Sequence, residues 1–240
     1  MPDRNEPFVV YRDAHFLVLH KPSGLATTSP GQGPTLVEAA HRLDPDAARL
    51  HPSSRLDAEV SGLVTFARTK EATEHLLAAR QQGGYARGYL ALAPSAPSPA
   101  AGEWREAIAI DPRDPRKRVV AGQGAQGARD AHSRYRTLDV LPQAALLWLS
   151  PQTGRTHQLR VHAAHAGIPL LGDRHYRGAA RVVRADGSVI SVRRTMLHCT
   201  RVSFPNPDGG ARLLFEALPP PDFVALWAAL DGPSLVLPPT

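Results

Sequence analysis

The 240-residue chain contains a single cysteine and lacks the features that define several protein classes. One cysteine, Cys199, excludes an intramolecular disulfide framework and is compatible with a reducing compartment. No apolar run approaches the roughly 20 residues that span a bilayer. The N-terminal stretch MPDRNEPFVVYRD lacks the charged start and long apolar segment of a signal peptide. We therefore expect a soluble, cytoplasmic protein with no membrane partner.

Nucleotide-binding and serine-hydrolase motifs are missing as well. The sequence has no GxxxxGK[ST] motif, no GxGxxG after a predicted strand and no serine in a nucleophile elbow. We therefore expect no nucleotide cofactor. Cys199 lies in an apolar-alternating run, which is typical of a small buried side chain and not of a nucleophile.

Positive charge is what the chain does have. It carries 28 Lys and Arg against 22 Asp and Glu, a net charge of +6 and a pI of about 10.0, so a polyanion is a plausible partner. Residues 113–129 combine a basic cluster with several glycines. The segment is either a mobile arm that contacts phosphates or a basic, solvated loop.

Hydrophobic periodicity predicts strands and helices mixed along the chain. Alternating residues predict strands at Phe8–Tyr11 and Phe16–His20, with a turn at 21–24. Helical spacing begins at Lys70 and stops at Gly83-Gly84. The Asp-Gly pair in PNPDGG indicates a hairpin before a strand at 211–218, and PSAPSPAAG reads as a loop. Further strands are expected at 63–66, 89–92, 135–140 and 144–149, and a final helix at about 222–230.

This order indicates an α+β fold around a largely antiparallel mixed sheet. No internal repeat is visible, and the 23 prolines are spread through connections instead of marking one linker. We therefore expect one domain over residues 1–240.

The densest chemistry lies in SPQTGRTHQLRVHAAHAG, residues 150–167. Thr153 or Thr156 can cap a helix there, and Gly167 can end it. Arg155 precedes or opens this helix and Arg160 lies within it. An arginine held on a helix is a rigid donor fork for a carboxylate or a phosphate.

Three histidines of this segment raise the question of a metal. Spacings of five and three do not place His157, His162 and His165 on one helical face, as a zinc site would require. A set of His162, His165 and the distant His198 remains as an alternative. Otherwise we expect no bound metal.

Several motifs occur in an order known from one family. RLDxxxSGL at residues 55–63 is followed by RGYLA at 87–91 and TGRTHQLRVHAAHAGIPLLGD at 153–173. The chain thereby resembles the RluA-type branch of the RNA pseudouridine synthases. LVLHKPSGL before these motifs and MLHCTRVSFPNP after them fit too, so the motif-bearing core covers about 9–217. Ser54 and Val60 depart from the family's usual histidine and threonine, which puts the local loop geometry and substrate choice in question.

The resemblance implies a pseudouridine synthase fold, without the small N-terminal RNA-binding module of many relatives, and isomerisation of uridine in RNA without a cofactor. It makes Asp57 the catalytic carboxylate, acting by covalent attack or by proton abstraction from the sugar. On the RLD tripeptide alone, a surface ion pair would be the better interpretation. A pocket that excludes water favours the neutral acid, and an adjacent guanidinium offsets this. By resemblance, Arg160 is that guanidinium.

The target uridine must leave its stack, which costs a few kcal/mol. Tyr89 either stacks on the flipped base or is a core residue of its strand, and Arg55 fills the vacated position in the RNA. Further RNA contacts are expected from basic residues of three segments: Lys21, Arg155, His157, Arg116, Lys117 and Arg118.

The expected partner is therefore a structured RNA, either tRNA or rRNA, bound by a monomer. Two other functions compete with this interpretation. One is a non-catalytic RNA-binding protein that retains the fold, and the other is a metal-dependent hydrolase of nucleic acid.

Overall fold

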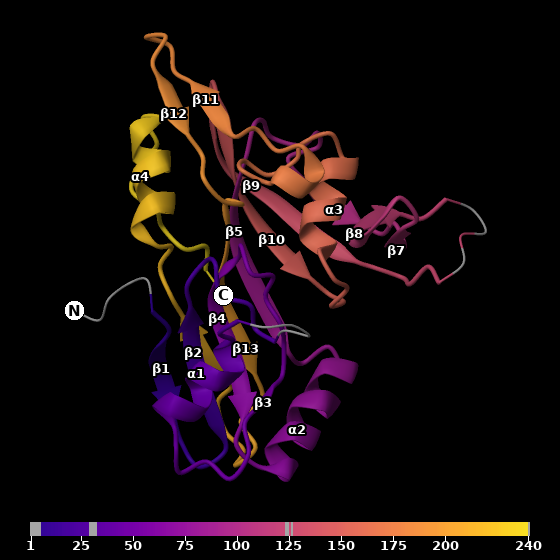
Figure 1. Ribbon diagram of the computed structural model, residues 1–240, viewed down its shortest axis with the longest axis vertical. Helices are drawn as coiled ribbons and strands as arrows, with labels where there is room; N and C mark the ends of the chain where they lie inside the picture. The colour runs from indigo at the N-terminus through magenta and orange to yellow at the C-terminus, as the bar shows by residue number, and fades with distance from the viewer. Residues whose placement is uncertain (1–5, 29–32, 123–124, 126, 240) are drawn as a thin grey trace. The chain divides into compact units, whose positions relative to one another are not determined.

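The computed structural model describes residues 6–28, 33–122, 125 and 127–239. The chain divides into two compact units, and each is described by itself (Figure 1). Unit 1 consists of Met1–Arg87 and His198–Pro219. Unit 2 consists of Gly88–Leu197 and Pro220–Thr240.

Unit 1 is built on a mixed sheet in the order β1-β2-β4-β13, with β14 on β13 and β3 on β4. The pairing of β4 with β13 is parallel, and the other pairings are antiparallel. Phe16 on β2 and Phe204 on β13 pack edge to face in the core. The strands are β1 (Phe8–Arg12), β2 (Phe16–Lys21), β3 (His51–Pro52), β4 (Ser61–Ala67), β13 (Leu197–Phe204) and β14 (Leu213–Glu216).

Two helices belong to unit 1, α1 (Leu36–Leu43) and α2 (Lys70–Gln81). The start of α2 at Lys70 and the left-handed Gly83 after it confirm the predicted helix and its stop. The helix α1 has no counterpart among the predicted elements. Its N-terminus carries a capping box, in which Thr35 and Glu38 each accept from the other's backbone N–H.

The main sheet of unit 2 is antiparallel and runs β5-β10-β9-β6. Its strands are β5 (Ala86–Ala93), β6 (Ala101–Trp104), β9 (Ser133–Leu141) and β10 (Ala144–Pro151). The predicted loop at 94–102 is correct only to residue 100, because Ala101 and Gly102 pair with Arg136 and Tyr135 of β9. The expected strands at 135–140 and 144–149 are confirmed.

Two hairpins accompany this sheet, β7–β8 (Ile108–Asp111, Asp114–Val120) and β11–β12 (Arg181–Val183, Val189–Ser191). The prediction of a mobile arm or loop over 113–129 is therefore wrong for its first part, because residues 114–120 form a paired strand. No GxGxxG motif was expected after a strand. The stretch GQGAQG at 122–127 matches this pattern and follows β8. Gln123, Gly124 and Gln126 lie outside the described residues, and the next element along the chain is β9, not a helix.

The helices of unit 2 are α3 (Gln158–His165), the 3-10 turn η1 (Arg174–Tyr176) and α4 (Pro221–Ala229). Phe223 and Trp227 of α4 lie in the core cluster with Leu90 and Leu92 of β5. Neither predicted threonine caps α3, since its N-cap residue is His157. None of the helices in the described part of the chain is long and apolar enough to cross a membrane.

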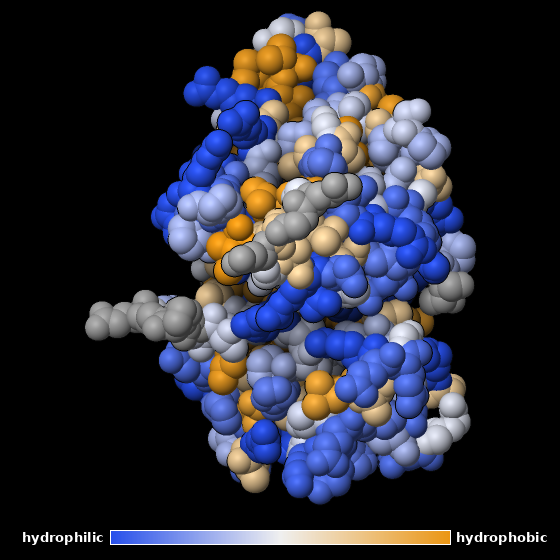
Figure 2. Space-filling model, turned by 90° about the vertical axis from the view of Figure 1, so that its right-hand side faces the viewer, coloured by the Kyte–Doolittle hydropathy of each residue, from blue (hydrophilic) through white to orange (hydrophobic). Residues whose placement is uncertain are grey.

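Together these elements confirm the predicted α+β class with a largely antiparallel mixed sheet. Figure 2 shows hydrophilic residues over most of the visible face, with hydrophobic residues in small separate patches. Cys199 is buried in β13, as its apolar surroundings predicted. That the whole chain forms one catalytic domain stays a prediction.

The parallel contact of β4 with β13 depends on a glycine. Gly62 has a φ of +122°, and a Cβ there would lie 2.3 Å from the carbonyl oxygen of Cys199. We expect Gly62→Ala to lower the free energy of unfolding by about 2 kcal/mol or more, because strain and a backbone overlap add. Urea unfolding measures this. Gly122→Ala is the control, since no atom lies within 4 Å of its Cβ position, and equal effects of both changes would contradict the prediction.

Candidate active site

The loop of residues 53–60, which carries Asp57 in unit 1, is held along its backbone. Thr27 both donates to the Leu56 carbonyl (2.8 Å) and accepts from the Leu56 N–H (3.0 Å). The carbonyl of Ala58 accepts from the N–H of Gly24 at 2.7 Å. The Ser23 hydroxyl donates to the Glu59 carbonyl at 2.9 Å. The turn at 21–27 therefore fixes the loop on both sides of Asp57.

Lys21 belongs to the same support. Its side chain is fully buried, and its ammonium donates to the carbonyls of Pro22 (2.9 Å), Leu25 (2.7 Å) and Ala58 (3.2 Å). A buried ammonium is tolerated where carbonyl oxygens replace its water. This burial argues against the predicted contact of Lys21 with RNA. The three hydrogen bonds instead join the turn to the Asp57 loop.

The side chains of the loop differ in exposure. Asp57 is partly exposed and Arg55 is exposed, whereas Leu56 and Val60 are buried. Ser54, one of the departures from the family pattern, is buried 3.5 Å from the Tyr85 hydroxyl. The loop thus presents the predicted catalytic carboxylate and its neighbouring arginine while its apolar residues anchor it.

In unit 2, Arg160 on α3 forms a buried, bidentate ion pair with Asp173. Nε and Nη2 of Arg160 donate to the two carboxylate oxygens, each at 2.7 Å. The two side chains are 2% and 0% exposed, respectively. Gly172 precedes Asp173 with a φ of +76°, and a Cβ there would lie 1.9 Å from the Arg194 carbonyl oxygen. A glycine is therefore required for the chain to place Asp173. That Arg160 holds Asp57 charged stays a prediction.

Tyr176 joins three elements around this ion pair. Its ring lies under the Arg160 guanidinium, 5.3 Å from ring centroid to Cζ, an arrangement in which the ring face attracts the cation. Its hydroxyl shares a 2.7 Å hydrogen bond with Nδ1 of His157 and accepts from the backbone N–H of Arg118 at 3.0 Å. Asp173 in turn caps η1 through the N–H groups of His175 and Tyr176. One tyrosine thus connects α3, the loop before it and β8.

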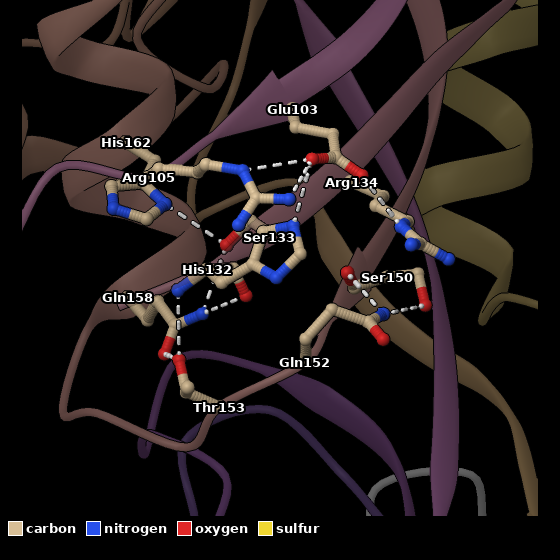
Figure 3. A network of polar contacts seen from close by, with 10 residues as sticks. All are labelled: Glu103, Arg105, His132, Ser133, Arg134, Ser150, Gln152, Thr153, Gln158 and His162. Carbon is tan, nitrogen blue, oxygen red and sulfur yellow. Dashed lines mark hydrogen bonds and ion pairs between the residues drawn. The ribbon is translucent and has the colours of Figure 1, made fainter. Parts of the chain in front are cut away.

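A polar network fixes the start of α3 (Figure 3). The Gln158 amide donates to the His132 carbonyl and the Ser133 hydroxyl, both at 2.9 Å, and accepts from the Thr153 hydroxyl (2.6 Å) and the Arg155 N–H (3.0 Å). All four hydrogen-bonding positions of the buried amide are used. The loop 153–157 is therefore tied to β9, with His157 in a left-handed conformation (φ 57°) at the helix start.

The same network occupies His162. Its Nε2 lies 3.0 Å from the Glu106 carbonyl, which can only accept, so Nε2 carries the proton and Nδ1 accepts from Ser133 at 2.9 Å. Burial is the main cause that lowers the pKa of His162, which favours this neutral form. Both ring nitrogens are thus engaged. Within the described residues, no group of three or more His, Cys, Asp or Glu side chains is arranged to hold a metal ion.

At the far edge of this network, Glu103 accepts from Arg105 and Arg134 and lies 3.2 Å from His132 (Figure 3). Gln152 donates to Ser150 nearby. The contact of Glu103 with Arg134 joins β6 to β9, whereas the contact of Gln152 with Ser150 is local to the end of β10.

The other predicted site residues of unit 2 lie in different settings. Tyr89 is 4% exposed on β5, opposite Leu149. Arg155 donates from Nε to the Asp130 carbonyl at 2.8 Å and is partly exposed. Three predicted basic residues lie on β8. Arg116 is exposed and paired with Asp114, whereas Lys117 and Arg118 are partly exposed.

Four supporting residues were not predicted: Asp173, Tyr176, Gln158 and Thr27. The first three lie in or beside the TGRTHQLRVH…LLGD motif, and their polar types among apolar neighbours are the only signal the sequence offers. Their partners come from other elements, so spacing along the chain could not assign them.

Known proteins match this chain over the region that carries the RLDxxxSGL and RGYLA motifs. The family model described as RNA pseudouridylate synthase matches residues 15–165. A ribosomal large subunit pseudouridine synthase D of Xanthomonas campestris pv. campestris is 35% identical over 233 residues, which cover 92% of this chain and 69% of the relative. A ribosomal large subunit pseudouridine synthase C of Vibrio vulnificus is 31% identical over 206 residues, covering 84% and 62%. The chain therefore spans about two thirds of the length of these relatives.

Two solved structures share the fold. Human RNA Pseudouridylate Synthase Domain Containing 4 aligns with a TM-score of 0.73 at 22% identity, over 93% of this chain and 92% of that one. Human RNA Pseudouridylate Synthase Domain Containing 1 aligns with a TM-score of 0.68 at 22% identity, over 96% and 97%. The pseudouridine synthase fold is thus confirmed, and from its motifs, its match over residues 15–165 and its relatives the chain belongs to the RNA pseudouridylate synthase family, in the RluA-type branch.

Proposed function

We propose that this chain isomerises a specific uridine to pseudouridine in structured RNA, with Asp57 as the catalytic carboxylate. The observation that carries the proposal is the support of the Asp57 loop. Backbone groups of Leu56, Ala58 and Glu59 are each held by the 21–27 turn, while Asp57 itself stays partly exposed. A carboxylate fixed in this way needs little reorganisation before it reacts.

The reaction breaks the C–N glycosidic bond and rejoins the same uracil through carbon, so no atoms are gained or lost. Asp57 acts at the sugar, either by attacking it or by removing a proton from it. The chemistry requires that the base be detached, rotated and kept in place. It involves no net oxidation and uses no cofactor.

Arg160 is the proposed electrostatic partner of this carboxylate. Its Nε and Nη2 are already committed to Asp173 at 2.7 Å, which fixes the plane of the guanidinium. A fork that is rigid before substrate binds can orient a second anion without losing side-chain freedom. Tyr89 is proposed to stack on the flipped base and Arg55 to fill its place in the RNA.

RNA contacts are proposed for the loop before α3 and for β8, which Tyr176 connects through His157 and the N–H of Arg118. Arg155, Lys117 and Arg116 complete this set, and Lys21 is left out because its ammonium is buried. The relatives are named as synthases of the ribosomal large subunit, which favours ribosomal RNA over transfer RNA. We further propose that the protein acts as a monomer in the cytoplasm.

Non-catalytic RNA binding is the alternative that the same fold allows. Phosphate binding alone has no need of a carboxylate held toward RNA, and this favours the enzyme. Mapping pseudouridines in total RNA with and without the gene would identify the substrate.

Replacing the carboxylate tests the catalyst directly. Asp57→Asn keeps the shape and removes the charge, so we expect pseudouridine formation to be abolished while thermal stability and RNA affinity stay near wild type. Chemical labelling of pseudouridine in ribosomal RNA transcripts measures turnover. Asp46→Asn, at an exposed acid of the same unit, should keep full activity. Substantial turnover by folded Asp57→Asn would refute the assignment, and RNA binding without turnover by the wild type would support the alternative.

The Arg160–Asp173 pair generates a second prediction. Arg160→Lys keeps the charge, but an ammonium cannot donate to both oxygens of Asp173 in the planar bidentate geometry of a guanidinium. We therefore expect greatly reduced turnover with a modest loss of RNA binding. Asp173→Asn leaves a buried guanidinium without its counter-ion and should lower the free energy of unfolding by about 3–5 kcal/mol. Urea unfolding and turnover are measured on both variants. Near-normal turnover by Arg160→Lys would show that Arg160 only packs or contacts the RNA backbone.

A further inference from the structure

Most of the net positive charge of the chain lies in one short segment. Residues 174–194, here called the arginine arm, contain six arginines and one aspartate, a formal charge of +5 in a chain of net charge +6. The arm comprises η1 and the β11–β12 hairpin. It lies beyond residues 15–165, which the family model matches, and it includes none of the predicted site residues.

The backbone of the arm is well anchored within unit 2. The hairpin pairs Arg181 with Ser191 and Val182 with Ile190, and the N–H of Val192 donates to the Ala180 carbonyl at 2.8 Å. Val182 and Val192 are buried in the core cluster that contains Trp227 of α4 and Leu230, which follows the helix. Figure 1 shows the hairpin beside α4, with its tip extending past the end of that helix.

Side chains alternate between the two faces of the β11–β12 hairpin, so the face opposite the core points to solvent. Because Val182 and Val192 point into the core, their neighbours Arg181 and Arg193 point to solvent, and both are exposed. Arg181 pairs with Ser191, and Arg193 follows Ser191 by two positions, just past the end of β12. The forks of both arginines therefore stand on one face.

The arginines of the arm differ in their partners. Arg194 forms a bidentate pair with Asp222, and Arg184 lies near Asp186 and Asp231. The remaining four make no ion pair with any carboxylate in the described part of the chain and are exposed: Arg174, Arg177, Arg181 and Arg193. Elsewhere on unit 2, Arg105 and Arg134 share Glu103. The arm thus retains guanidinium groups whose charge is not balanced locally.

We propose that the arginine arm binds the phosphate backbone of the RNA substrate, as a second contact surface away from the reacting uridine. The inference rests on the proposed function, which supplies the polyanion. Guanidinium forks match phosphate oxygens in pairs, and backbone phosphates are read without regard to sequence. An arm of this kind adds affinity and orientation and leaves the choice of uridine to the site.

Salt dependence of RNA binding tests the proposal. The log–log slope of the binding constant against salt changes by roughly 0.7–0.9 for each phosphate that the protein no longer neutralises. The double variant Arg181→Gln/Arg193→Gln should therefore flatten the slope by roughly 1.4–1.8 relative to the full wild-type chain, measured with an unmodified stem-loop transcript of ribosomal RNA. Arg181→Lys/Arg193→Lys keeps both charges and should keep most of the slope.

The matched control removes the same charge elsewhere. Arg105→Gln/Arg134→Gln also takes two positive charges from unit 2, but from arginines already paired with Glu103, and should leave the slope unchanged. Circular dichroism and thermal unfolding confirm that each variant is folded.

The outcomes separate this inference from the proposed function. Suppose that the wild type forms pseudouridine and the slope is unchanged in Arg181→Gln/Arg193→Gln. This result would contradict RNA binding by the arginine arm and would be consistent with the proposed function. If the same variant keeps the RNA slope but binds anionic lipid vesicles more weakly, the arginine arm contacts a membrane surface. This result would also contradict RNA binding by the arm. Absence of salt-dependent RNA binding by the wild type overturns both. An equal change of slope in the control would show a general effect of net charge and contradict a specific contact.

Discussion

The buried ion pair between Arg160 and Asp173 is the interaction on which the rest of unit 2 depends. Taking two charges out of water is costly unless their geometry is good and other hydrogen bonds satisfy the remaining atoms. Here both conditions hold. Two 2.7 Å bonds join the fork to the carboxylate, and the same carboxylate accepts the N–H groups that start η1. Asp173 therefore balances the charge of Arg160 on α3 and caps η1, and Tyr176 of η1 lies under the guanidinium.

Several parts of this arrangement were predictable from sequence. Periodicity predicted the strands around Phe16 and Tyr89 and the helix from Lys70. The helix buries one face, with Ala72, Leu76 and Ala79, whereas the two strands are buried along most of their length. The motifs point to Asp57 and Arg160 by resemblance to the family, and the catalytic roles of both residues stay predictions. The α1 helix was missed although Thr35 and Glu38 carry a capping-box signature, so a local signal for this helix is present in the sequence.

Other parts depend on partners that sequence spacing does not reveal. The segment 114–120 was expected in a loop because residues 113–129 combine a basic cluster with glycines, but pairing with Ile108–Asp111 makes it a strand. Lys21 was expected to contact RNA, but its buried ammonium donates to the carbonyls of Pro22, Leu25 and Ala58. His157 begins α3 in a left-handed conformation, held by Tyr176 nineteen positions later. In each case tertiary contacts override the local preference.

The Gln158 network has a direction as well as a geometry. The Thr153 hydroxyl donates to Gln158, Gln158 donates to Ser133, Ser133 donates to His162, and His162 donates to the Glu106 carbonyl. Each proton position is fixed by the group that follows it, because the carbonyl at the end can only accept. No single hydroxyl, amide or ring can be turned over without reversing its neighbours. The loop that presents Arg155 and the connection that leads into β7 therefore share one proton arrangement, and such chains strengthen cooperatively, so this corner of the fold behaves as a single polarised unit.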